Sequence, residues 1–144
     1  QAKTGSDFSF VSLANEVNRS MPTFVADRAQ EVLGARNKVL GGSKVLIVGL
    51  GYKTGSGDTR ESPSISLAEI LRSRGSQVFA FDSHVATEQW PAQVARVSET
   101  EQTAFDLAIF ASEYPGESAA WVLKKAETIL DTRNSVPGPH VERL

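Results

Sequence analysis

KVLIVGLGYKTGSGDTRESPS, residues 44–64, is the stretch that decides the fold. It opens with an almost continuous apolar run, which is typical of a strand buried on both faces of a parallel sheet. Near its end, Ser62 and Pro63 form a helix start, a hydroxyl N-cap followed by proline at the first helical position. The stretch therefore predicts a strand, a glycine turn, an extended loop and a delayed helix.

Apolar segments of similar length continue along the chain. After the helix that should end at Gly75, further strands are expected in SQVFAFDSHV, DLAIFASEY and TILDTRNSV, and a helix in GESAAWVLKKAE. EQWPAQVARVSET is ambiguous between a short helix and a short strand, and PGPHVERL is expected to be irregular. Strands that alternate with helices predict an α/β fold, a Rossmann-like three-layer sandwich around a mostly parallel sheet.

Residues 1–36 are expected to form an N-terminal helical arm. Apolar residues recur at helical spacing in DFSFVSLANEVNRSM and again in SMPTFVADRAQEVLG, where Gly34 is a stop signal. Two interpretations of this arm stay open: packing against the following domain, or an interface between two copies of the chain. A polar linker then leads into a second unit, residues 43–144.

Composition argues against several classes of function. Lys and Arg number 15 against 17 Asp and Glu, a formal net charge of −2, so we expect no nucleic-acid partner. The chain has no cysteine, which excludes a disulfide, a thiolate metal site and a cysteine nucleophile within it. No apolar run approaches the roughly 20 residues of a membrane span. The two histidines are isolated in sequence, and we expect no metal site.

The glycine turn departs from a dinucleotide-binding fingerprint at one position. That fingerprint is Gly-x-Gly-x-x-Gly with a helix directly after it. Gly49 and Gly51 fit, but Thr54 stands where the third glycine belongs. A ribose-binding acid should follow about 20 residues later, and Asp82 comes later than that. Independent binding of NAD by this domain is therefore not expected.

Three cations are expected at the carboxyl ends of strands, where parallel sheets bind their ligands. Lys53 and Arg60 lie in the loop after the first strand, and Arg133 follows the last expected strand. If these side chains converge, they suit an anionic ligand such as a phosphate. The alternative is a solvated loop in which Lys53 and Arg60 pair with Asp58 or Glu61.

The blocks GLGYK and DTRESP, followed by FDSHV, SEY and LDTRN, stand in the chain in that order. Together they resemble the C-terminal, nucleotide-sugar-binding domain of the UDP-glucose/GDP-mannose dehydrogenase family. Upstream, VNRSMPTFVADR is similar to a segment of that family's central dimerisation helix. Its Asn-x-x-Met-Pro form resembles members that act on UDP-N-acetylhexosamines more than those that act on UDP-glucose.

The resemblance implies roles for four residues. Tyr52, Lys53 and Arg133 would contact a UDP-sugar, and Arg60 would reach across a cleft toward NAD held by another domain. Enzymes of this family oxidise the sugar C6 alcohol to a carboxylate in two NAD-dependent steps, using a catalytic cysteine that this chain does not contain.

The chain is thus expected to be a C-terminal piece of a cytoplasmic dehydrogenase that forms a homodimer through the helical arm. It would bind the UDP-sugar, contribute no catalytic residue and be inactive alone. Two alternatives remain: a stand-alone module that binds nucleotide sugars without chemistry, and a dimerisation module whose cleft is vestigial.

Overall fold

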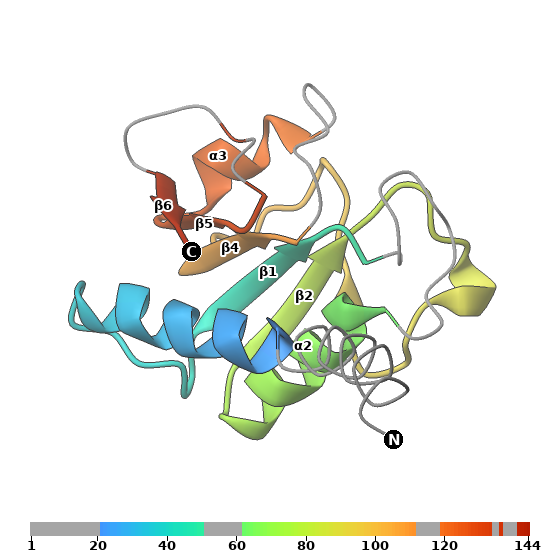
Figure 1. The fold of residues 1–144 in the computed structure, drawn as a ribbon. Coiled ribbons are helices and arrows are strands. Elements are labelled where there is room, and N and C mark those ends of the chain that lie inside the picture. Colours follow the sequence, from blue (N-terminus) through green and yellow to red (C-terminus); the bar gives the residue numbers. More distant parts are fainter. Residues whose placement is uncertain (1–20, 51–61, 112–118, 134–135, 137–140) are drawn as a thin grey trace, which may run out of the picture.

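The computed structural model describes residues 21–50, 62–111, 119–133, 136 and 141–144. Within these ranges, six strands form one sheet in the order β3-β2-β1-β4-β5-β6 (Figure 1). The strands are β1 (Lys44–Val48), β2 (Gln77–Phe81), β3 (Ala95–Arg96), β4 (Leu107–Phe110), β5 (Ile129–Asp131) and β6 (Val141–Arg143). Every pairing between neighbouring strands is parallel, so the predicted α/β fold is confirmed.

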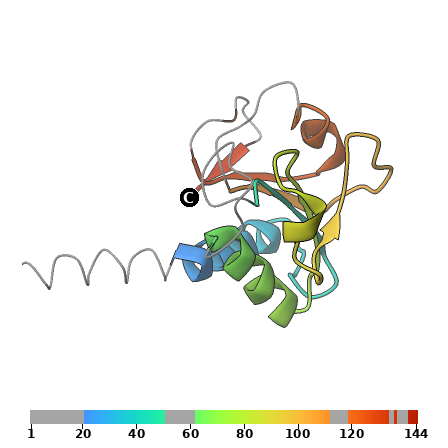
Figure 2. The same ribbon diagram turned by 90° about the vertical axis from the view of Figure 1, so that its right-hand side faces the viewer.

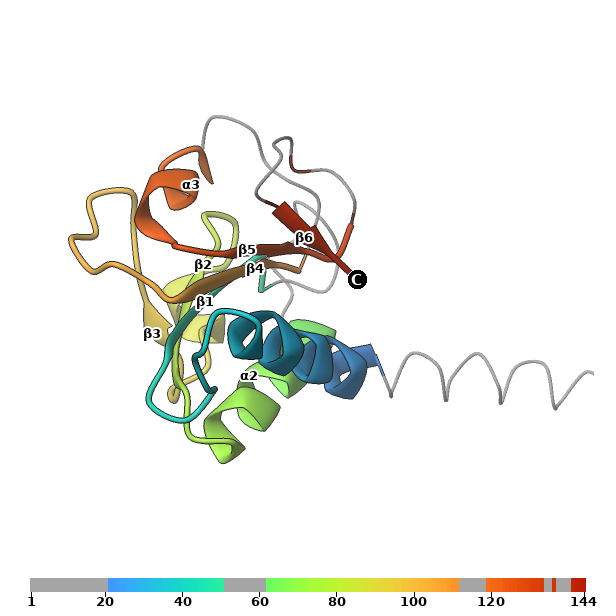
Figure 3. The ribbon, with the colours of Figure 1, turned by 90° about the vertical axis from the view of Figure 1, so that its left-hand side faces the viewer.

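Helices cover both faces of the sheet and complete the three predicted layers (Figure 3). The helix at residues 21–34 and α2 (Pro63–Ser73) lie on one face, and the short α3 (Val122–Lys125) lies on the other. Alternate residues of β1 join the two apolar cores, for example Ile47 beneath α2 and Leu46 beneath α3. Because both faces are covered, as Figure 2 also shows, the central strands are apolar over most of their length, in β1 from Val45 to Val48.

The start and end of α2 follow the sequence signals. The Ser62 hydroxyl oxygen accepts a hydrogen bond from the Ser64 N–H at 3.2 Å, and Pro63 is the first helical residue. After the helix, Gly75 takes a φ of +96°, which closes the helix in the left-handed conformation. A Cβ at Gly75 would also lie 3.1 Å from the Gly41 Cα. Both the N-cap and the glycine stop are therefore confirmed.

Residues 21–34 of the predicted arm are helical and pack on the sheet. Their buried side chains share one core with α2 and the strands, and they include Val25, Ala29, Val32 and Leu33. Met21 and Phe24, which the sequence pattern placed on the same stripe, are 37% and 54% exposed. Both belong to the first turn of the described helix, whereas in the turns that follow it the apolar side chains of the same stripe are buried. Residues 1–20 of the arm lie outside the described residues.

The C-terminal tail departs from the prediction. The stretch expected to be irregular contains β6, which pairs with β5 so that Arg143 lies opposite Asp131. A three-residue edge strand with two charged residues has no apolar run, so periodicity could not reveal it. The ambiguous stretch before residue 100 contains a 3-10 turn, η1 (Thr87–Gln89), and the short strand β3.

A charged cluster fixes the segment between the helix at 21–34 and the sheet. The Lys38 ammonium lies 2.7 Å from a carboxylate oxygen of Asp106, just before β4, and 2.6 Å from one of Glu127, just before β5. Asp106 also accepts the Lys44 N–H at 2.8 Å. This cluster lies at the amino ends of the strands, and we assign it a structural role.

Acid should weaken this cluster. Burial raises the pKa of Asp106, but hydrogen bonds from the Lys38 side chain and the Lys44 N–H outweigh it, so the pKa lies below its ordinary value. A carboxyl whose pKa is lowered by folding stabilises the fold at neutral pH, and this contribution is lost as the pH falls through the folded-state pKa. We expect Asp106→Asn to be less stable than the wild type at neutral pH.

The difference between the two proteins should begin to shrink near the ordinary aspartate pKa of about 4, and it should close as the pH falls through the lower pKa of Asp106 in the folded protein, where the wild-type carboxyl becomes protonated as well. Urea denaturation of both proteins between about pH 7 and about pH 3 measures it. A constant difference across that range would contradict the role given to ionised Asp106.

Candidate functional site

The order of the strands along the chain reverses between β1 and β4. The chain leaves β1 toward β2 on one side, while β4 lies on the other side of β1. In open parallel sheets, ligands bind at such a reversal of strand order. The segments that leave this edge follow β1, β2, β4 and β5, and the predicted site residues lie on those that follow β1 and β5.

The turn after β1 is held by the neighbouring strand. Gly49 has a φ of +97°, a conformation that favours glycine, and its N–H donates to the Phe81 carbonyl at 2.9 Å. The next N–H, that of Leu50, donates to a carboxylate oxygen of Asp82 at 2.8 Å. Leu50 itself is fully buried. The chain therefore enters the loop at residue 51 from a fixed backbone.

The far end of the same loop is attached to this point. The Ser62 hydroxyl donates to the Leu50 carbonyl at 2.7 Å, while its oxygen caps α2. The residue before position 51 and the residue after position 61 are thus in direct contact. Tyr52, Lys53 and Arg60, the predicted ligand-binding residues of this loop, lie outside the described residues.

Asp82 occupies the end of β2, where dinucleotide-binding domains carry a ribose-binding acid. One of its carboxylate oxygens accepts the Leu50 N–H, and the other accepts the His84 N–H at 2.9 Å. Both oxygens therefore hold the backbone of two adjacent turns. This use of the carboxylate favours a positioning role over the recognition of a ribose.

Arg133 lies on a turn that the end of β5 fixes closely. Its N–H donates to one carboxylate oxygen of Asp131 at 2.9 Å, and the Val136 N–H donates to the other at 2.7 Å. The Thr132 hydroxyl donates to the Phe110 carbonyl at the end of β4, at 2.7 Å. Arg133 itself is exposed, so its side chain is accessible, and its contact with a ligand stays a prediction.

Two residues that hold this turn, Asp131 and Arg143, were not among the predicted site residues. The Asp131 side chain is fully buried, and the Arg143 guanidinium donates to it at 3.1 Å and to the Val136 carbonyl at 3.2 Å. Asp131 belongs to the block LDTRN, so the sequence indicated that it lies at the end of a strand. No sequence pattern indicated Arg143, because it lies on the edge strand that was not predicted.

Aromatic residues pack against one another on the α3 side of the sheet. Phe81 and Trp121 meet edge to face with ring centroids 5.3 Å apart, and so do Phe79 and Phe105. The Arg96 guanidinium lies over Trp90, 4.3 Å from the ring centroid. Trp121 therefore packs against the core beneath α3, where it contacts the last residue of β2.

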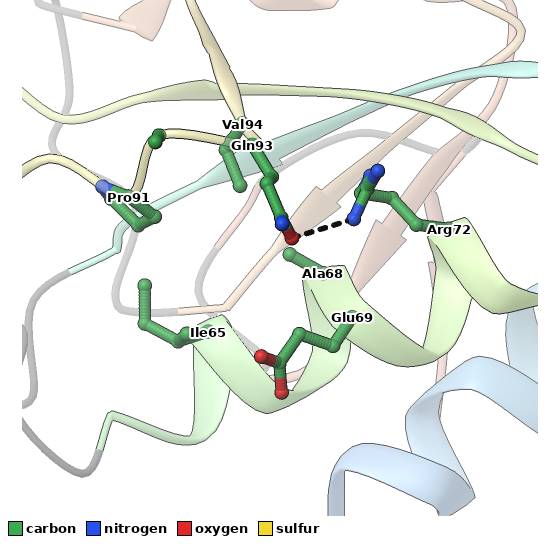
Figure 4. A pocket seen from close by; sticks show the side chains of 8 residues that line it. Ile65, Ala68, Glu69, Arg72, Pro91, Gln93 and Val94 are labelled. Carbon is green, nitrogen blue, oxygen red and sulfur yellow. Dashed lines mark hydrogen bonds between the residues drawn. The ribbon is translucent and has the colours of Figure 1, made fainter.

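A shallow cavity of about 230 Å³ lies between α2 and residues 91–94 (Figure 4). The Arg72 guanidinium crosses it to the Gln93 side-chain oxygen at 2.7 Å, and Ile65 and Pro91 face each other across its other end. Arg133, the predicted site residue that the structure describes, does not line this cavity. We therefore place the candidate site at the carboxyl ends of the strands.

Within the described ranges, no group of three or more His, Cys, Asp or Glu side chains is placed to hold a metal ion. No helix among these residues is long and apolar enough to cross a membrane.

Comparison with known proteins identifies the domain. The family model described as "UDP-glucose/GDP-mannose dehydrogenase family, UDP binding domain" matches residues 46–137. This span runs from β1 to the turn that carries Arg133, and it includes both halves of the candidate site.

Individual relatives agree with this match. UDP-N-acetyl-D-mannosamine dehydrogenase from Pyrococcus horikoshii is 29% identical over 140 residues, 94% of this chain and 32% of that protein. GDP-mannose 6-dehydrogenase from Azotobacter vinelandii is 47% identical over 45 residues, 31% of this chain and 10% of that protein.

A solved structure extends the likeness to the fold. UDP-N-acetyl-mannosamine dehydrogenase from S. aureus superimposes with a TM-score of 0.73 at 27% identity, covering 99% of this chain and 34% of that one. The chain thus spans about a third of the length of the relatives that it matches along most of its own length. It belongs to the UDP-glucose/GDP-mannose dehydrogenase family, of which it contains the UDP-binding domain.

Proposed function

We propose that this chain is the UDP-sugar-binding part of an NAD-dependent nucleotide-sugar 6-dehydrogenase. In this proposal Tyr52, Lys53 and Arg133 contact the UDP-sugar, and Arg60 contacts NAD held by another domain. The complete enzyme would oxidise the C6 alcohol of the sugar to a carboxylate in two steps. The chain contains no cysteine, so the proposal gives it binding residues and leaves the catalytic cysteine to another part of the protein.

One observation carries the proposal: the two segments that bear the predicted cations are anchored at the same edge of the sheet. The loop at 51–61 is attached at the end of β1, through Leu50 and Ser62, and the Arg133 turn is attached at the end of β5. β4 separates β1 from β5, so the two anchors are roughly 10 Å apart. A nucleoside diphosphate can span that distance between a lysine and an arginine.

The chemistry of these residues suits a diphosphate. Arg133 offers a planar guanidinium that can bind two phosphate oxygens at once, and Lys53 offers a compact positive charge. Asp82, the residue that would bind the ribose of NAD in a dinucleotide-binding domain, instead holds the backbone of two turns. The cations suit the diphosphate of either ligand, so it is the use of Asp82 that favours a UDP-sugar over NAD as the ligand of this domain.

The sugar and the assembly follow from further observations. Two relatives that match most of the chain, from Pyrococcus horikoshii and S. aureus, are named for UDP-N-acetylmannosamine, so we propose a UDP-N-acetylhexosamine as substrate. Met21 and Phe24 expose apolar surface on the helix at 21–34, and we propose that the helical arm forms a homodimer. An enzyme that uses NAD and UDP-sugars would work in the cytoplasm.

UDP binding tests the proposal. We expect Lys53→Ala and Arg133→Ala each to raise the Kd for UDP about tenfold or more, since a hydrogen bond to a charged group contributes roughly 1.5–3 kcal/mol. Isothermal titration of the chain with UDP, at one fixed salt concentration, measures both changes. UDP is the probe because it carries the diphosphate and base that this domain should recognise.

Arg36→Ala is the matched control. Arg36 is an exposed arginine in the turn that leads toward β1, so it has the same charge as Arg133 but lies away from the candidate site. Its replacement should leave the Kd unchanged. Equal effects of Arg36→Ala and Arg133→Ala would indicate non-specific attraction of the anion, and no effect of Lys53→Ala or Arg133→Ala would place the ligand elsewhere.

A further inference from the structure

Polar contacts connect the helix at 21–34 to the turn that carries Arg133. The Arg28 side-chain Nε–H donates to the Arg143 carbonyl at 2.8 Å. The Arg143 guanidinium donates to one oxygen of Asp131 at 3.1 Å, and the other oxygen accepts the Arg133 N–H at 2.9 Å. Four residues from three separate parts of the chain therefore form one continuous set of contacts.

The central member of this set depends on its partners. Asp131 has a fully buried side chain, and a buried carboxylate is stable only where donors and an opposite charge compensate it. Arg143 supplies the charge, and it also donates to the Val136 carbonyl at 3.2 Å. One guanidinium thus holds both the end of β5 and the far side of the Arg133 turn.

Arg28 in turn holds the strand from which Arg143 projects. β6 is a three-residue strand at the edge of the sheet, paired with β5 on one side. Besides the Arg143 carbonyl, Arg28 contacts a Glu142 carboxylate oxygen at 3.6 Å and one of Glu31, on its own helix, at 3.0 Å. The helix passes beside the C-terminal end of the chain (Figure 3). An edge strand this short has few other contacts to fix its position.

We propose that Arg28 and Arg143 are positioning residues for Arg133. Through them, the seating of the helix at 21–34 on β6 sets the turn from which Arg133 meets the diphosphate. This inference rests on the proposed function of Arg133. It adds that the affinity for UDP depends on a helix that carries no predicted ligand contact.

The chain offers a matched control on the same helix. Arg74, just after α2, contacts an Asp27 carboxylate oxygen at 2.9 Å and the Gln30 side-chain oxygen at 3.1 Å. Like Arg28, it joins the helix at 21–34 to another element through its guanidinium. Its contacts lead to α2 and away from Asp131. Arg74→Met should therefore cost a similar amount of stability without moving Arg133.

The test is a double-mutant cycle on UDP binding. Arg28→Met removes the guanidinium and keeps a flexible, helix-forming side chain. We expect it to raise the Kd for UDP about threefold to tenfold, and to have no further effect in the Arg133→Ala background. Arg74→Met should leave the Kd unchanged in both backgrounds. Thermal unfolding of each variant shows how much stability each substitution costs.

A second readout does not need UDP. The Arg133 and Val136 amide protons are bonded to Asp131, so their exchange with solvent, followed by NMR, should speed up in Arg28→Met and stay at the wild-type rate in Arg74→Met. An equal rise in Kd in both backgrounds, an unchanged Kd, or unchanged exchange would each overturn the inference. If the wild type bound no UDP, the proposed function would fail, and amide exchange would still decide whether Arg28 positions the turn.

Discussion

Replacing Asp131 with alanine is expected to lower the free energy of unfolding by about 3–5 kcal/mol, because two backbone N–H groups lose their acceptor at about 1–3 kcal/mol each and a hydrogen bond between charged groups is lost as well. The substitution leaves the Arg143 guanidinium without its carboxylate partner. It also removes the acceptor for the Arg133 and Val136 N–H groups. Urea denaturation of both proteins, analysed with a common m-value, measures the change.

Asp27→Ala is the control for this prediction. Asp27 also pairs with an arginine, at 2.9 Å, but its side chain is 60% exposed. Exposed ion pairs contribute about 0–1 kcal/mol because water solvates both charges, so this variant should stay close to the wild type. The burial of Asp131 is what separates the two predictions. A loss of less than about 1 kcal/mol in Asp131→Ala would mean that water replaces the missing carboxylate.

The parts of the fold that sequence reasoning recovered are those with a local physical cause. β1 is apolar from Val45 to Val48 because helices cover both of its faces, and that run is visible in the sequence. The start of α2 depends on a hydroxyl cap and a proline, and both act within one turn of helix. Such features need no knowledge of distant residues, which is why residues 44–50 and 62–75 were predicted closely.

The parts that it missed depend on contacts between distant residues. Arg143 and Asp131 are 12 residues apart, and Arg28 and Arg143 are 115 residues apart. No periodicity predicts such pairs, and β6 is held by backbone pairing to β5 and by the Arg28 side chain. Of the four predicted site residues, only Arg133 lies among the described residues, and the ligand-binding roles of all four stay predictions. Asp82, Asp131 and Ser62 hold the backbone beside these positions. The sequence shows that these residues are present, but it does not show which backbone groups they bind.

Ser62→Ala should have the second largest effect on stability. The Ser62 hydroxyl caps α2, which contributes about 0.5–2 kcal/mol. It also donates to the buried carbonyl of Leu50, and leaving that carbonyl without its donor costs about 1–3 kcal/mol. We therefore expect a loss of about 2–4 kcal/mol in the free energy of unfolding, measured by urea denaturation. Because the same hydroxyl joins the two ends of the loop at 51–61, the Kd for UDP should rise as well.

Ser73→Ala separates the specific effect from a general one. Ser73 lies in the same helix, and its hydroxyl donates at 2.6 Å to the Ile70 carbonyl, an exposed contact at the opposite end of α2. Water can replace that bond, so stability should change by less than about 0.5 kcal/mol and the Kd for UDP should not change. If Ser62→Ala lost stability but kept the wild-type Kd, the hydroxyl would serve the helix alone. A Kd that rises in Ser62→Ala and not in Ser73→Ala, under conditions where both variants are fully folded, would show that the contact between Leu50 and Ser62 holds the loop in the conformation that binds UDP.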